Sequence, residues 1–177
     1  VPAYVRYALA TAALKSAKDS FQINPLPPNF EALRSRYFNA YLPWQEVAPF
    51  SFCSDDAIQL LDNTNTYPID TLNILDNLSS GTWTLAEVSN SSAKGYPALD
   101  YLLFFSVLTG DVAMSFEDTN RRSYLSAIVD ELDANAQAVY NEWNRTGQNY
   151  VATFINNDSL ETGSSLHLLI NSLSEYF

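Results

Sequence analysis

The sequence predicts an all-α protein, an irregular bundle of about four principal helices joined by long loops. Apolar residues recur at intervals of three and four in nearly every long segment, whereas the strict alternation typical of strands is scarce. With 47% hydrophobic and only 16% charged residues, the chain can bury a sizeable core. Its 177 residues suit a single helical domain over the whole of 1–177.

A proline-rich turn separates the first two predicted helices. The first covers about residues 3–21, and the run Asn-Pro-Leu-Pro-Pro at 24–28 must end it. The side chains expected on its buried face are those of Val5, Leu9, Ala13 and Ala17. The second helix is expected to start near Asn29 as N-cap, and Pro43 to kink it or end it early. Its expected buried stripe is Phe30, Leu33, Tyr37, Tyr41 and Trp44.

Long loops at 49–68 and 79–94 flank a short predicted helix over 70–78, which Asp70 can cap. Loops of this length are uncommon in compact domains and are usually functional or mobile.

Three more segments of the second half have helical periodicity. Pro97 suits the first position of a strongly apolar helix that reaches about Leu108. The longest helix is expected over 118–144, and the last from about Asp158 onward. The buried stripe expected for the longest helix is Leu125, Ile128, Leu132, Ala136, Val139 and Trp143.

Charge and composition exclude several functions. Twenty acidic against nine basic residues give a net charge of −11, which disfavours nucleic-acid binding. A single cysteine, Cys53, and a single histidine, His167, exclude an intrachain disulfide, a thiolate zinc cluster and a multi-histidine metal site. A metal would therefore rest mainly on oxygen ligands. No apolar run reaches the roughly 18 residues that a membrane span needs.

Isolated candidate residues have simpler interpretations. The acidic groups at 55–56 and 130–133 lack EF-hand spacing, so a solvated helix face is favoured over a metal site. His167 lies in an apolar run, which favours a half-buried histidine with one hydrogen-bond partner over a ligand or base. Cys53 has no basic neighbour in sequence, which favours an inert thiol. The many Tyr and Phe residues fit a core.

One segment is more specific. Residues 95–104 read Gly-Tyr-Pro-Ala-Leu-Asp-Tyr-Leu-Leu-Phe. This resembles the signature of the imelysin-like family, bacterial envelope proteins first described as insulin-cleaving peptidases, whose motif is Gly-x-His-x-x-Glu followed by Tyr-Leu-Leu-Phe. Other pieces that agree in order are Pro2-Ala3-Tyr4, Trp44-Gln45-Glu46 with Pro49-Phe50-Ser51-Phe52, Tyr67-Pro68-Ile69-Asp70, Arg121-Arg122-Ser123-Tyr124-Leu125 and Trp143.

The resemblance covers essentially the whole chain but only the N-terminal half of the family. It implies half of a two-bundle architecture, so that 1–177 would belong to a longer protein and pack against a second helical bundle. Family members are associated with iron uptake or iron-regulated expression. They are commonly periplasmic or lipid-anchored at the outer membrane, so an envelope receptor or transporter is an expected partner.

The family's chemistry is reduced at the motif itself. The family's His and Glu lie three residues apart on one helix face, where both could contact one cation. Here Gly95 is retained, but Pro97 stands at the His position and Asp100 at the Glu position. Proline offers no ligand atom, which leaves Asp100 as the one candidate metal ligand. A structural carboxylate that bonds a neighbouring Tyr or Arg is an equally good interpretation of Asp100.

The resemblance therefore favours a non-catalytic envelope protein that takes up or binds a ligand, iron or another divalent cation, through a cleft near the start of the Pro97 helix. The candidate lining residues are Trp44, Glu46, Asp70, Gly95, Tyr96, Pro97, Asp100 and Tyr101. One alternative is a metallopeptidase of the same family, although a zinc hydrolase normally needs three protein ligands and a base. Another is a protein–protein interaction module without a small ligand.

Overall fold

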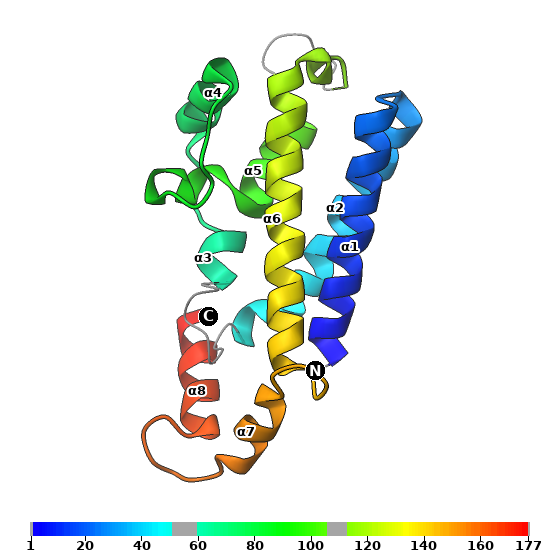
Figure 1. Ribbon diagram of the computed structural model, residues 1–177. Coiled ribbons are helices and arrows are strands. Elements are labelled where there is room, and N and C mark those ends of the chain that lie inside the picture. The colour runs from blue at the N-terminus through cyan, green and yellow to red at the C-terminus, as the bar shows by residue number, and fades with distance from the viewer. Residues whose placement is uncertain (1, 51–59, 106–112, 177) are drawn as a thin grey trace.

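The computed structural model describes residues 2–50, 60–105 and 113–176, and every regular element within them is a helix (Figure 1). In chain order these are α1 (Pro2–Ile23), α2 (Pro27–Val47), η1 (Ala48–Phe50), α3 (Leu60–Thr64), α4 (Thr71–Ser80), η2 (Val88–Ala93), α5 (Gly95–Phe104), η3 (Met114–Glu117), α6 (Thr119–Trp143), α7 (Tyr150–Asn156) and α8 (Ser165–Tyr176). The all-α prediction is confirmed. Among the described helices, none has the length and apolar character needed to cross a bilayer. Cys53, Asp55 and Asp56 lie outside the described residues.

Helices α1, α2 and α6 are the long members of the bundle, and α5 lies among them (Figure 1). Helix α1 packs on α2 and on α6, and α5 packs on α6. The short helices α3 and α4 lie on the other side of α6 from α1, and α7 and α8 lie near its C-terminal end. The core is continuous and rich in aromatic rings.

The buried face of α1 differs from the expected one. Its buried side chains alternate at spacings of three and four, and include Tyr4, Tyr7, Thr11, Leu14, Lys18 and Phe21. The expected stripe through Leu9 was wrong, because Leu9 is 67% exposed. The true stripe contains a threonine and a lysine, which a search for apolar residues alone rejects.

Helix α2 begins earlier and ends later than expected. Its N-cap is Leu26, and prolines fill its first two positions, where the missing N–H has no intrahelical partner to lose. Asn29 therefore lies inside the helix and does not cap it. Pro43 also lies inside, and the helix continues to Val47. Burial of Trp44 and Val47 beyond the proline stabilises this last turn in the core.

The C-terminal end of α5 is fixed by two arginines. Arg34 of α2 donates from Nε and Nη2 to the carbonyl oxygen of Leu103, at 3.0 and 2.7 Å. Arg121 of α6 donates to the carbonyl oxygen of Leu102 at 2.7 Å. Both cations stand where the helix dipole is negative and the last carbonyls lack intrahelical partners. Helix α5 thus starts at Gly95, two residues before Pro97, and its last helical residue is Phe104 rather than the expected Leu108.

In the second half of the chain, the longest helix agrees with the sequence prediction, whereas the helices near the C-terminal end differ from it. All six residues of the stripe expected for α6 are buried. Helix α7 was not predicted, and α8 begins at Ser165 rather than near Asp158. His167 is half-buried in α8, as expected, but its ring has two hydrogen-bond partners rather than one. Its Nδ1 accepts from the Gly163 amide at 2.8 Å, and its Nε2 lies 3.1 Å from the side-chain amide nitrogen of Asn171.

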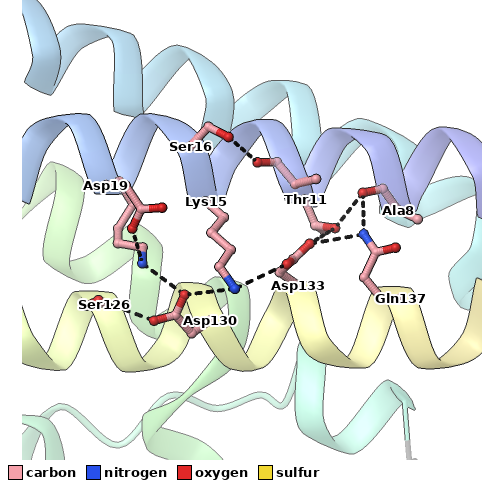
Figure 2. Close-up of polar contacts among 11 residues, drawn as sticks. Ala8, Thr11, Lys15, Ser16, Asp19, Ser126, Asp130, Asp133 and Gln137 are labelled. Carbon is pink, nitrogen blue, oxygen red and sulfur yellow. Dashed lines mark hydrogen bonds and ion pairs between the residues drawn. The ribbon is translucent and has the colours of Figure 1, made fainter.

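A partly buried polar network joins α1 to α6 (Figure 2). The nearly buried ammonium of Lys18 lies 2.7 Å from the carboxylate of Asp19 and 2.9 Å from that of Asp130. Burial alone would lower the pKa of Lys18, but hydrogen bonds to Asp19 and Asp130 outweigh it and raise that pKa. The fully buried Thr11 hydroxyl donates to Asp133 Oδ1 at 3.1 Å. Asp130 and Asp133 thus pair with α1, and Glu131 pairs with Lys94, so this acidic group is not simply a solvated face.

We expect Asp133→Ala to lower the free energy of unfolding by about 1 kcal/mol, because it removes one of two acceptors of Thr11 and Gln137, which keep the Ala8 carbonyl oxygen. Asp133 Oδ1 accepts from both Thr11 and Gln137, the latter at 3.2 Å. Asp133→Asn keeps an acceptor oxygen and loses only the 3.5 Å charge contact with the exposed Lys15, so it should remain much closer to the parent. Urea unfolding of the three proteins measures this, and equal losses in both variants would contradict it.

Candidate functional site

The start of α5 is held by the irregular chain that precedes it. Tyr124 of α6 donates its hydroxyl hydrogen to the carbonyl oxygen of Ala93, and the Lys94 ammonium contacts the carbonyl oxygen of Leu85 and the carboxylate of Glu131, at 2.9 and 3.0 Å. Gly95 then enters the helix with φ of +72°, a conformation that side-chain-bearing residues rarely adopt. These contacts fix where the α5 side chains lie.

Four of the candidate residues face inward. Trp44, Gly95, Tyr96 and Pro97 are all buried, and the rings of Trp44 and Tyr96 lie 6.3 Å apart between centroids. Pro97 therefore packs in the core. The rings of Trp44 and Tyr96 contribute to the aromatic centre of the bundle, as the stripe predicted for α2 requires.

Buried polar atoms gather beneath the start of α5. The hydroxyls of Tyr7, Thr64 and Tyr96 are fully buried, and none has a hydrogen-bond partner within normal distance. The same holds for the indole N–H of Trp44. The Tyr7 hydroxyl interacts with those of Thr64 and Tyr96. A layer of oxygen atoms therefore lies under the first turn of α5, contributed by α1, α3 and α5.

Asp100 differs from these residues because it is exposed. Its carboxylate faces the hydroxyl of Tyr37 in α2 and lies within electrostatic reach of the Tyr67 hydroxyl. Burial and then the adjacent carboxylate raise the pKa of Tyr37 far above its usual value. Burial, Tyr41 and Asp100, in that order, also raise the pKa of Tyr67. Phenol groups thus surround the one carboxylate at the family motif.

The remaining candidates have structural partners of their own. Glu46 forms an exposed ion pair with Arg6 of α1. Asp70 caps α4 by accepting a hydrogen bond from the Asn73 amide at 3.0 Å, as the sequence predicts. The ring of Tyr101 stacks on Phe105 with centroids 5.2 Å apart. The structure does not test their roles in ligand binding, which stay predictions.

A hollow of about 310 Å³ lies beside α3 and η2. Its lining includes Asp62, Thr66, Glu87 and Lys94, and does not include Asp100 or Tyr101. The surface around Asp100 is therefore a separate feature from this hollow, and the two offer different chemistry.

Sequence reasoning missed the tyrosines around Asp100. Tyr37 and Tyr41 appear in the predicted stripe of α2 as core residues, and Tyr67 only as part of a turn. The available signal was their spacing, since Tyr37 and Tyr41 are four residues apart and share a helix face. Their rings are in fact parallel, with centroids 6.0 Å apart.

The match of the whole chain to a family model decides its family. The model described as imelysin matches residues 1–177. The chain belongs to the imelysin family. This confirms the resemblance first seen in the segment at 95–104.

Two proteins that are similar to this chain carry names that refer to iron. Iron-regulated protein A of Synechococcus elongatus is 27% identical over 143 residues, which are 81% of this chain and 37% of that protein. The crystal structure of an iron-regulated protein A precursor from Parabacteroides distasonis superposes with a TM-score of 0.74 at 17% identity. That superposition covers 97% of this chain and 50% of the other, so the chain spans half or less of either relative's length. The structural likeness shows the fold.

The imelysin metal pair does not fit the residues present. Pro97 at the His position is buried and has no donor atom, whereas Asp100 is exposed. Among the described residues, no group of three His, Cys, Asp or Glu side chains is placed to hold a metal ion. The motif of this chain therefore keeps only one of the two metal-binding side chains of the family pair.

The buried tyrosines predict alkaline instability. Burial raises the pKa of Tyr7, Tyr37 and Tyr96 well above 10, and that of Tyr124 to about 12. Above pH 10 the unfolded chain loses these protons while the folded chain keeps them, so the free energy of unfolding falls as pH rises. We expect a slope of about 1.4 kcal/mol per pH unit for each such tyrosine above its unfolded pKa.

Urea midpoints at pH 8, 10 and 11, together with tyrosinate absorbance, would measure this alkaline effect. The parent should unfold as its buried tyrosines ionise, in one transition. Reversible ionisation of all tyrosines near pH 10 with an unchanged midpoint would contradict it.

Proposed function

We propose that this chain is a non-catalytic imelysin-family protein of the bacterial cell envelope, periplasmic or attached to the outer membrane. It acts in the acquisition of iron or another ligand through the surface at the start of α5. The observation that carries the proposal is the contrast at the family motif. Pro97 is buried and inert, while Asp100 remains exposed and faces phenol groups.

The names of the relatives support an iron-related role. One is called iron-regulated protein A, and the other is described as a precursor of such a protein, which fits an exported protein. The net charge of −11 favours cations over anionic ligands. The proposal includes attachment to the outer membrane through a lipid anchor.

A peptidase function receives less support. A catalytic zinc site normally uses three protein ligands and leaves one position open for water. The described residues contain no such group. We therefore expect the purified chain to cleave neither insulin nor casein, with or without zinc, and chelator-sensitive cleavage would overturn the non-catalytic proposal.

Iron accumulation under iron limitation tests the acquisition role. Cells that carry Asp100→Asn in their own copy of the gene should accumulate less iron than cells with the parent gene. Cells with Asp76→Asn are the matched control, because Asp76 is an exposed carboxylate of α4 that is not among the candidate lining residues. Equal iron accumulation in all three strains would count against the proposal.

An interaction module is a second candidate, and an exposed aromatic face favours it. Phe38 and Leu42 of α2 are 53% and 66% exposed, and the Phe38 ring lies 5.3 Å from that of Phe104 at the end of α5. Phe105 is also exposed. Such a face commonly marks an interface. A second helical bundle is the proposed partner, because the chain spans half or less of its relatives.

Sedimentation of the 177-residue chain separates these two candidates. Self-association that Phe38→Ser reduces would support a docking face. A monomer that binds no hydrophobic dye would argue against it and leave the ligand-binding function as the proposal.

A further inference from the structure

A second hollow lies between α4 and η2, apart from the family motif. Its volume is about 360 Å³, within the range of roughly 300–1,000 Å³ that small-molecule sites occupy. Helix α4, which forms one wall, lies on the other side of α6 from α1 (Figure 1). The described lining combines the side chains of Asn73, Asn77 and Asn90 with three hydroxyl residues, Trp83 and Glu87. We term this feature the amide hollow.

Two buried asparagines give the amide hollow a fixed base. Asn77 and Asn90 are 8% and 5% exposed. Asn77 Nδ2 donates to Asn90 Oδ1 at 2.7 Å and to the Tyr124 hydroxyl at 3.1 Å, and Asn90 Nδ2 donates to the Thr84 carbonyl oxygen at 3.0 Å. These bonds hold both amides in one orientation before a ligand arrives, which lowers the entropic cost of binding.

The hollow also presents polar oxygens that the fold does not use. Asn73 donates from its side-chain nitrogen to the carbonyl oxygen of Ser89, and Asn77 uses its own nitrogen as described above. Within residues 2–50, 60–105 and 113–176, no donor bonds the side-chain oxygen of Asn73 or of Asn77, and Glu87 forms none of the ion pairs. Neither amide oxygen is a fully buried orphan, so solvent or a ligand can reach both. The available groups are therefore mainly acceptors, which suit a ligand rich in O–H and N–H donors.

Charge and polarity narrow the class of ligand. The described residues of the lining include no Lys, Arg or His, so an anion would meet only oxygens and the Glu87 carboxylate. The net charge of −11 adds to this repulsion. An apolar ligand would remove water from the amide oxygens without replacing its hydrogen bonds, which is costly. A neutral ligand with many hydroxyl groups avoids both penalties.

Trp83 adds an aromatic surface to the polar lining. It is half-buried, and its ring meets that of Tyr124 edge-on with centroids 5.0 Å apart. The other tryptophans, Trp44 and Trp143, are buried in the core. An indole supplies a flat apolar face and an N–H donor. A sugar ring has apolar C–H faces and a hydroxyl-bearing edge, so it can pack on the indole while its edge bonds the amides.

We propose that the amide hollow binds a neutral saccharide, with oligomers of N-acetylglucosamine as the first probe. The acetamido group of this sugar supplies an N–H donor in addition to its hydroxyls, which suits the free oxygens of Asn73 and Asn77. The inference goes beyond the proposed function and does not depend on it, because it concerns α4 and η2 rather than the surface around Asp100.

The test is calorimetric titration of the purified 177-residue chain with the tetramer of N-acetylglucosamine, with tryptophan fluorescence recorded in parallel. We expect saturable binding and a change in indole emission, because Trp83 is the more exposed tryptophan. Trp83→Ala should weaken binding by about tenfold, since it removes the aromatic surface. Glu87→Gln should also weaken it by about tenfold, since it removes a charged acceptor. Cellotetraose, which lacks acetamido groups, should bind less tightly, and tetragalacturonate, which is anionic, should not bind.

Asp62→Asn is the matched control for Glu87→Gln. Asp62 is also an exposed carboxylate, but it lines the neighbouring hollow beside α3 and not the amide hollow. This variant should keep the affinity of the parent. Glu87 is exposed, so its replacement should leave the fold intact, and circular dichroism checks this for every variant.

Failure of the parent to bind any of the neutral sugars would overturn the inference. Parent-like affinity in both Trp83→Ala and Glu87→Gln would also overturn it, because the sugar would then bind elsewhere. Tighter binding of tetragalacturonate, or of the polycation spermidine, than of the neutral sugars would contradict the assigned ligand class. Equal affinity for cellotetraose would support the neutral saccharide and remove only the preference for acetamido groups.

Discussion

Replacing Trp44 by alanine should lower the free energy of unfolding by about 3–5 kcal/mol. The indole is fully buried at the centre of the bundle, where its ring centroid lies 5.7 Å from that of Tyr7 and 6.3 Å from that of Tyr96. Alanine would leave a large cavity between α1, α2 and α5. Its indole N–H has no hydrogen-bond partner, so the loss would be one of packing and apolar burial alone.

Trp83→Ala is the matched control for this substitution. Trp83 is half-buried in a loop, where its ring meets Tyr124 edge-on at 5.0 Å. We expect Trp83→Ala to lower the free energy of unfolding by less, about 1 kcal/mol. Chemical denaturation of both variants measures the difference. A Trp44→Ala protein as stable as the parent would place the indole at the surface, and would favour the sequence-based hypothesis that it lines a ligand cleft.

Helices α6 and α1 show which buried faces the sequence could predict and which it could not. The stripe of α6 was predictable, because its members at 125–143 are apolar and recur at helical spacing. The stripe of α1 was not, because Thr11 and Lys18 are buried against polar partners on α6. The partners lie 122 and 112 residues away, at Asp133 and Asp130. Such compensation arises from the tertiary fold and leaves no local pattern.

The predicted helix boundaries were wrong where packing in the core outweighed local sequence preference. Pro43 is a strong helix breaker, yet α2 passes through it because Trp44 and Val47 complete the core. At Asp70 and Asp118 local chemistry and tertiary structure agree, and both carboxylates cap the helices that follow.

The candidate site was predictable only in its motif. The family pattern located Gly95, Pro97 and Asp100, and the structure shows that the first two are buried and the last is exposed. The tyrosines that surround Asp100 come from α2 and from the segment before α4. Tyr37 illustrates why they were missed, since it is a core residue by burial, at 4% exposed, yet its hydroxyl faces the carboxylate. Hydropathy describes the ring of a tyrosine and not the direction of its hydroxyl.

Replacing Gly95 by alanine should lower the free energy of unfolding by about 2–5 kcal/mol, because two penalties combine at this position. Its φ of +72° is unfavourable for any residue with a side chain. A Cβ there would also lie less than 3.0 Å from the carbonyl oxygen of Thr64. That oxygen belongs to the backbone of α3 and cannot rotate away, so α3 or α5 would have to shift.

Gly163→Ala separates the two penalties. Gly163 has a similar φ of +87°, but a Cβ there would meet nothing within 4 Å. We expect Gly163→Ala to lower the free energy of unfolding by about 1 kcal/mol, which is the conformational penalty alone. The difference in urea midpoint between the two variants then reports the contact of α5 with Thr64. Equal losses would mean that α3 can give way freely, and that Gly95 is needed in this sequence only for its backbone angle. A larger loss for Gly95→Ala would show that the close approach of Gly95 to the Thr64 carbonyl adds a second penalty to that of the backbone angle.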